Sequence, residues 1–205
     1  MLSLQKTYDQ NELNKWAEVS DAVGTLKIDG NSLSLIYEKG KLTLAKTRGN
    51  GRVGEDVTEK AQWVSDVIPQ LKDPIDVEVR GELYCTASQF SIVTDKMESL
   101  GLDRPTNPRN IVAGFLGRKA YFDLCRYFSF FGFEVLFPEG VKPPFKTEME
   151  KFSWLEEQGF PLPLPKKISG EDQMSAFLDS VRKVMSEGEI GIDGAVFSYD
   201  KLSYT

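Results

Sequence analysis

Hydrophobic and polar residues alternate along most of the chain, and the period of this alternation changes several times. Residues 11–23 carry apolar side chains at helical spacing, which predicts an amphipathic first helix. Between residues 24 and 46 the period falls to two in the runs LSLIYE and LTLAK, and Lys39 and Gly40 between them indicate a β-hairpin. The next segment, TRGNGRVG at 47–54, is rich in glycine and predicts a loop.

The remaining patterns mix helices and strands without a regular βαβ rhythm. After the loop, GEDVTEKAQWV is expected to be helical; further helices are expected at 87–100, from 107 onward, at 149–157 and at 171–185, and strands at 75–84, 126–136 and 190–200. Two proline-rich stretches, at 137–145 and 159–167, read as connecting loops. These patterns favour an α+β fold with antiparallel sheets over a doubly wound parallel sheet.

Composition and charge narrow the class of protein. The 205 residues are 40% hydrophobic, enough for the core of one large domain or two small ones, and 25 basic against 31 acidic side chains give a net charge of −6. This balance argues against tight autonomous binding of DNA, because Lys and Arg supply most of the non-specific affinity. No apolar run is long enough to cross a membrane, and the first ten residues lack the order of a signal peptide. We therefore expect a cytoplasmic protein without a membrane partner.

Histidine is absent, and the only two cysteines, Cys85 and Cys125, lie far apart in the sequence. Catalytic triads, HExxH zinc sites and imidazole proton shuttles are excluded within this chain. The cysteine spacing fits neither a zinc finger nor a disulfide framework, so both are expected to be buried thiols. Chemistry must rest on Lys, Arg, carboxylates, hydroxyls, thiols or a metal.

The segment Lys27, Ile28, Asp29 and Gly30 is the first candidate for such chemistry. As a bare KxDG pattern it is weak, and the alternative is a solvated lysine at the end of a strand. Its position at the entrance to the predicted hairpin, however, places the lysine at a sheet edge that faces a cleft. A lysine whose surroundings favour the neutral amine can act as a nucleophile.

Three further charged residues lie in segments that are otherwise glycine-rich or apolar. Arg48 lies in the glycine-rich loop, where a guanidinium can contact a phosphate, although a surface turn is the alternative. Glu82 and Asp193 are acids within apolar strands, which favours a ligand role. If their strands converge near Lys27, the two carboxylates could hold Mg²⁺ together with water and phosphates.

Several sequence blocks together resemble the adenylation (nucleotidyltransferase) domain of NAD-dependent DNA ligases. They cover nearly the whole chain in the matching order: MLSL at 1–4, LKIDG at 26–30, TRGNGRVGEDVT at 47–58, EVRGELY at 78–84, NPRN at 107–110, FSFFGF at 128–133 and IDGAV at 192–196. EVRGE and NPRN separate this branch from ATP-dependent ligases and capping enzymes. The resemblance implies the nucleotidyltransferase (ATP-grasp-like ligase catalytic) fold, with antiparallel sheets flanked by helices.

The resemblance also implies a reaction. Lys27 would attack the α-phosphate of NAD, expel nicotinamide mononucleotide and carry AMP as a phosphoramidate, with Mg²⁺ as a cofactor. Arg48 would contact the ribose or phosphate, and Glu82 the ribose. Asp29 and Asp193 would shape the surroundings of the metal and phosphate, and the metal ligands would be Glu82 and Asp193.

The remaining nucleotide contacts are carried over in the same way. Phe133 matches the aromatic residue that stacks on adenine, and Val196 matches the apolar residue opposite it. The other positions implied in nucleotide binding are Thr25, Leu26, Asn107, Arg109 and Ser198.

Three positions depart from the family pattern. Thr25 stands where the family has a glutamate that contacts adenine, and Ser198 stands where a phosphate-contacting lysine is expected. After NPRN, the family's arginine position falls on Gly117, with Arg118 displaced by one. These departures motivate an alternative, namely a non-catalytic nucleotide-binding or scaffolding subunit of a multi-chain ligase.

Residues 1–205 are expected to form one adenylation domain. The resemblance implies that these residues lack the upstream segment with which the family binds nicotinamide mononucleotide and the family's last nucleotidyltransferase motif. Nicked DNA, met in replication and repair, would be bound through additional domains or a second subunit.

Overall fold

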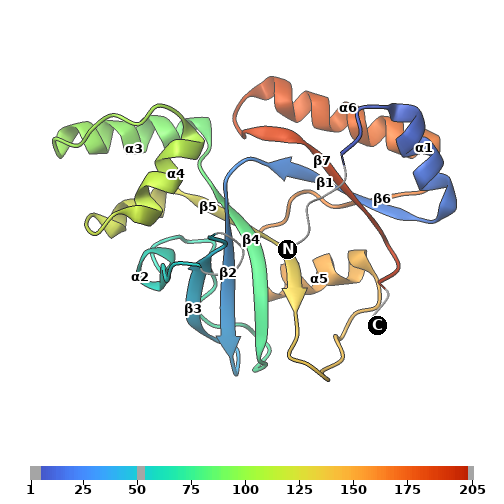
Figure 1. The fold of residues 1–205 in the computed structure, drawn as a ribbon, viewed down its shortest axis with the longest axis horizontal. Helices are drawn as coiled ribbons and strands as arrows, with labels where there is room; N and C mark the ends of the chain where they lie inside the picture. Colours follow the sequence, from blue (N-terminus) through green and yellow to red (C-terminus); the bar gives the residue numbers. More distant parts are fainter. Residues whose placement is uncertain (1–5, 50–53, 203–205) are drawn as a thin grey trace.

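Two antiparallel sheets organise the structure, a computed structural model that describes residues 6–49 and 54–202. The smaller sheet has the order β6-β1-β7 and consists of Lys166–Ile168, Ala22–Ile28 and Ile192–Tyr199. The larger sheet has the order β3-β2-β4-β5 and consists of Lys41–Thr47, Asn31–Glu38, Val77–Tyr84 and Ser129–Leu136. Figure 1 shows the smaller sheet at the upper right and the larger one below and to the left. The predicted α+β architecture is confirmed.

Helices cover both sheets. Helices α1 (Gln10–Val19) and α6 (Glu171–Glu187) lie against the smaller sheet, whereas α5 (Glu148–Gln158) packs on β5 of the larger one. The other helical elements are α2 (Thr58–Ala61), α3 (Ala87–Ser99), α4 (Pro108–Gly117) and the 3₁₀ segment η1 (Phe122–Tyr127). No helix in the described part of the chain is long and apolar enough to span a membrane.

Some predicted boundaries were wrong. The first helix ends at Val19 rather than at residue 23, because Ala22 and Val23 pair with both β6 and β7 and are buried there. The helix predicted after the loop is only the single turn α2, and the strand predicted from residue 126 begins at Ser129, after η1. The predicted hairpin is confirmed, since Lys39 and Gly40 adopt φ values of 50° and 77° between β2 and β3. The short strand β6 was not predicted.

Alternation along β1 divides its side chains between two hydrophobic cores. Ala22, Leu26 and Ile28 pack with Phe177 in the smaller core beneath α6, whereas Val23 belongs to the larger core. Because successive side chains of a strand point to opposite faces, Thr25 and Lys27 share the face of Val23. That face is turned away from α6.

Two glycines in the sequence blocks are required by close backbone contacts. A Cβ added to Gly30 would lie 2.3 Å from the carbonyl oxygen of Leu83, and one added to Gly81 would lie 2.1 Å from the carbonyl oxygen of Phe131. Both distances are impossible for a real side chain. These glycines therefore bring the start of β2 close to β4, and β4 close to β5.

Candidate functional site

Lys27 and Asp193 form the centre of the candidate site. Lys27 lies near the end of β1, opposite Gly194 of β7, and the pairing shifts immediately after it. Its Nζ donates a hydrogen bond of 2.7 Å to Oδ2 of Asp193, and the two side chains are 39% and 47% exposed. The hydrogen bond from Lys27 holds the pKa of Asp193 below its ordinary range. This pair is open to a ligand from solution.

The turn after β1 brings Asp29 to the start of α4. Asp29 Oδ1 lies 3.1 Å from the guanidinium of Arg109, and the backbone N–H of Asp29 donates to the carbonyl of Gly191 at 2.8 Å. Asn107 caps α4, because its side chain accepts from the backbone N–H of Asn110 at 2.8 Å. The NPRN block thus begins a helix whose second residue, Arg109, faces the KIDG turn.

Glu82 reaches the same site from the larger sheet. It accepts a hydrogen bond of 2.7 Å from the hydroxyl of Ser32 on β2. Burial nevertheless raises the pKa of Glu82 to about 7, since desolvation outweighs the favourable effects of Ser32 and Lys27. The charges of Lys27, Asp29 and Arg109 all act on Glu82. These four residues, predicted separately, are therefore brought together.

Arg48 follows β3 and is exposed. Its backbone N–H donates to the carbonyl oxygen of Ser32 at 3.3 Å, and the hydroxyl of the same serine holds Glu82. Arg48 is therefore placed at the Glu82 end of the larger sheet. Residues 50–53 of the predicted loop lie outside the described residues.

The residues expected around the base lie on both sheets. Phe133 is half-buried on β5, where its ring centroid is 6.1 Å from that of Phe131, and it packs against both cores. Val196 is opposite Thr25 in the pairing of β7 with β1, on the face that carries Lys27. The side chain of Leu26 points the other way and is buried in the smaller core, so it does not line this face.

Ser198 lies farther along β7, opposite Val23. It lies four positions after Gly194, which corresponds to about 13 Å along a strand. This placement does not fit the expected phosphate contact beside Lys27. The hydroxyl of Ser198 instead donates a hydrogen bond of 3.1 Å to Glu148 of α5.

Another departure from the family pattern lies at the end of α4. Gly117 is the last residue of this helix, and a side chain there would meet no neighbour within 4 Å. The guanidinium of Arg118 lies over the ring of Phe115, 5.0 Å from its centroid. Arg118 is therefore engaged in packing on α4.

The structure reveals a polar cluster on α5 that the sequence did not suggest. Glu148 and Lys151 are buried on α5 and pair at 2.8 Å. Their spacing on the helix was a weak signal, because charged residues three apart usually lie on a solvated face.

No cluster of three or more potential metal-ligating side chains of His, Cys, Asp or Glu exists within residues 6–49 and 54–202. Of the two carboxylates expected to hold Mg²⁺, Asp193 pairs with Lys27 and Glu82 with Ser32. A metal site at Glu82 and Asp193 therefore stays a prediction.

The comparison with known families decides to which family the chain belongs. The family model described as "NAD-dependent DNA ligase adenylation domain" matches residues 1–205. The chain belongs to this family. The blocks that contain Lys27, Glu82, Arg109 and Asp193 thus occur in an adenylation domain, which favours this interpretation over a non-catalytic scaffold.

Individual relatives agree. The chain is 36% identical over 211 residues to a DNA ligase of Thermoanaerobacter sp. (strain X514), covering 98% of the chain and 32% of the relative. It is 33% identical over 216 residues to a DNA ligase of Thermotoga petrophila, covering 100% of the chain and 31% of the relative. The chain therefore spans about a third of the length of these relatives.

A solved structure confirms the fold. A mycobacterial DNA ligase D complexed with ATP and MES superposes with a TM-score of 0.52 at 16% identity, covering 90% of this chain and 50% of that one. At this identity the likeness concerns the fold alone, and it supports the expected nucleotidyltransferase architecture.

Proposed function

We propose that this domain performs the first step of an NAD-dependent DNA ligase, in which AMP is transferred from NAD to Lys27. The observation that carries the proposal is the convergence of Lys27, Asp29, Glu82 and Arg109 at one open site in a member of this family. Lys27 and Asp29 come from the LKIDG block, Glu82 from EVRGELY and Arg109 from NPRN. AMP carried by the protein would then serve the sealing of nicks in DNA, together with further parts of the ligase.

The chemistry follows from the contacts of Lys27. A bond forms between Nζ of Lys27 and the α-phosphorus of NAD, and the bond from that phosphorus to the oxygen of nicotinamide mononucleotide breaks. The ammonium must first lose a proton to solvent, because the carboxylate of Asp193, 2.7 Å away, has a pKa held below its ordinary range and is a weak base. Arg109 and Arg48 are the cations available to the phosphates, and Glu82 to the ribose.

Magnesium is part of the proposal as a partner of the nucleotide. Mg²⁺ retains several waters and is usually held by one or two carboxylates together with substrate phosphates, so it does not require three preformed protein ligands. Glu82 and Asp193 are the carboxylates that we predict for this role. When bound, the ion would neutralise charge that develops on the phosphates.

Intact-mass spectrometry after incubation with NAD and Mg²⁺ tests the proposal. A ligase that contains this domain should gain the mass of one AMP moiety, NAD should be preferred to ATP, and Lys27→Arg should abolish the adduct while keeping the positive charge. The isolated chain should adenylate itself from NAD very slowly or not at all. Lys72→Arg, at an exposed lysine outside the site, is the matched control and should retain it. An adduct that survives in the Lys27→Arg variant, or no adduct in the wild type within a ligase that contains this domain, would overturn the proposal.

A further inference from the structure

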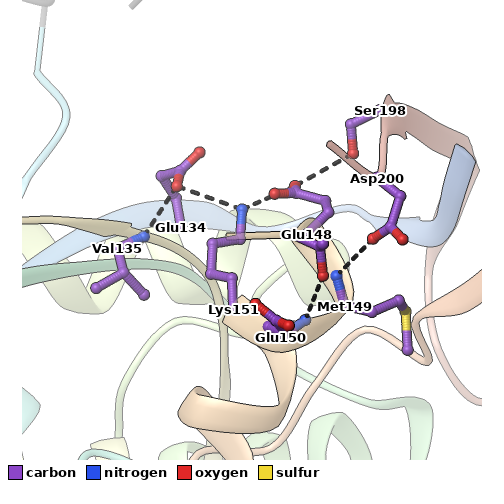
Figure 2. A network of polar contacts seen from close by, with 9 residues as sticks. Glu134, Val135, Glu148, Met149, Glu150, Lys151, Ser198 and Asp200 are labelled. Carbon is purple, nitrogen blue, oxygen red and sulfur yellow. Dashed lines mark hydrogen bonds and ion pairs between the residues drawn. The ribbon is translucent and has the colours of Figure 1, made fainter. Parts of the chain in front are cut away.

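Helix α5 inserts a buried ion pair between the two sheets. Lys151 is 2% exposed, and its Nζ donates to Oε1 of Glu148 at 2.8 Å and to Oε1 of Glu134 on β5 at 3.3 Å. Ser198 on β7 donates to the same Oε1 of Glu148 at 3.1 Å. Figure 2 shows Lys151 between the two glutamates, with Ser198 on the far side of Glu148. The cluster therefore connects β5 to β7.

The cluster lies beside both residues expected to enclose the base. Glu134 immediately follows Phe133, and Ser198 shares a strand face with Val196, two residues away. Ser198 also lies on the face that carries Lys27, but it is about 13 Å along β7 from Gly194, the residue opposite Lys27. The cluster is thus at the end of the site where the base, rather than the phosphate, would be located.

The helix that carries the pair is fixed to β7. Asp200 accepts the backbone N–H of Glu148 through its carbonyl oxygen at 2.7 Å and that of Met149 through its carboxylate at 3.0 Å. These two hydrogen bonds, visible in part in Figure 2, hold the first turn of α5 against the end of the strand. Glu148 is therefore held in one place relative to Ser198.

We propose that Glu148 and Lys151 are positioning residues that make Ser198 a hydrogen-bond acceptor and so select a 6-aminopurine nucleotide. A hydroxyl has one proton, and Ser198 gives its proton to a carboxylate oxygen that cannot donate in return. Only its lone pairs then remain for a ligand. They match the amino group of adenine and oppose the carbonyl oxygen of a 6-oxopurine such as hypoxanthine.

Another observation is that Glu148 lowers stability where it lies. Its Oε2 is buried and finds no hydrogen-bond partner among the described residues. A buried carboxylate oxygen without a donor lowers stability. A hydrophobic pair of similar size would often be at least as stable as the buried ion pair. The orientation of Ser198 is a function that such a pair could not perform.

The relative affinity for AMP and IMP tests the inference. The inference rests on the proposed function, in which an adenine base binds between Phe133 and Val196. Calorimetric or competition binding to the wild-type chain should favour AMP by at least about tenfold. Ser198→Ala, and the paired change of Glu148→Leu with Lys151→Met, should each bring the ratio close to one, whereas Ser198→Thr should preserve it. The paired change avoids leaving one buried charge alone. Glu157→Gln, at an exposed residue of the same helix, is the control.

The ratio separates a positioning role from a structural one. Loss of packing would weaken AMP and IMP equally, with circular dichroism reporting whether the variant is folded, and that result would overturn the inference. Equal wild-type affinities, or no binding of either nucleotide, would also overturn it. If NAD forms the Lys27 adduct without any preference for AMP over IMP, only this inference fails. If AMP is preferred but no adduct forms, only the proposed function fails.

Discussion

Replacing Glu82 by glutamine should stabilise the free protein while impairing its reaction. Burial raises the pKa of Glu82 from 4.5 to about 7, so the folded state holds a proton there more tightly than the unfolded chain does. As pH rises from about 4.5 to about 7, ionisation of this buried carboxyl becomes a growing cost to folding. Above about pH 7 the cost is constant. Glutamine keeps the shape of the side chain and does not ionise.

The size of the effect follows from the two pKa values. Relative to the wild type, Glu82→Gln should gain about 1 kcal/mol at pH 5 and about 3 kcal/mol at pH 8. Urea unfolding followed by tryptophan fluorescence at a series of pH values measures it directly. Formation of the Lys27 adduct should become slower in the same variant.

Glu78 supplies a matched control with the opposite sign. It lies on the same strand and face as Glu82, and although burial opposes its ionisation, hydrogen bonds from Arg80 and Ser34 outweigh this and hold the pKa of Glu78 below its ordinary range. Its charged form therefore stabilises the fold above about pH 4.5, and Glu78→Gln should destabilise the protein at pH 8 but much less at low pH. A Glu82→Gln variant without any gain at pH 8, or with the same gain at pH 5, would refute the reasoning.

Three other properties can be checked with the wild type or single variants. Gly81→Ala should prevent folding or lower the free energy of unfolding in urea by at least about 3 kcal/mol, since its Cβ would lie 2.1 Å from the carbonyl oxygen of Phe131. Gly114→Ala on α4 is the control: its Cβ meets no neighbour, and the free energy of unfolding should change by about 1 kcal/mol or less. Burial raises the pKa of Cys85 and of Cys125 to about 12, so thiol reagents at pH 8 should modify neither in the native protein and both after unfolding; rapid native labelling would contradict this. With a net charge of −6, the chain should show no submicromolar binding to nicked duplex DNA at physiological salt, and fluorescence anisotropy would reveal a basic surface if it did.

The elements that could be predicted from the sequence are those in which the local pattern and the long-range contacts agree. β2 and β4 alternate strictly, and their buried residues are the ones that the alternation indicates. In β3, whose pairing with β2 has a register shift, the buried residues are Leu42 and Ala45, which the alternation does not indicate. Ala22 and Val23 fit a helix or a strand equally well, and only their pairing with β6 and β7 decides between the two. β6 is three residues long and carries no pattern of its own, so nothing local could reveal it.

The site divides in the same way. Lys27, Asp29 and Glu82 lie in short blocks whose glycines are required by backbone contacts, so the sequence carries a local signature of them. Glu148 and Lys151 have no such signature. Their burial depends on Glu134, 14 positions upstream of Glu148, and on Ser198, 50 positions downstream of it. These residues come together only because α5 packs against two sheets. Polar groups of this kind become visible only in three dimensions.

The ion pairs of the free site bear on how a nucleotide can bind. Lys27 and Arg109 each already contact a carboxylate, Asp193 and Asp29, so phosphates that bind these cations come close to the two acids. Carboxylates next to bound phosphates repel them, and the repulsion cancels part of what the cations contribute. A divalent cation that arrives with the nucleotide removes this repulsion by placing positive charge between the two groups. We therefore expect Mg²⁺ to increase the affinity for NAD in the Lys27→Arg variant, where no adduct forms, and to do so less when Asp193→Asn is added. Calorimetric titration of NAD with and without Mg²⁺ measures this coupling, and an affinity that is the same in both conditions would contradict it.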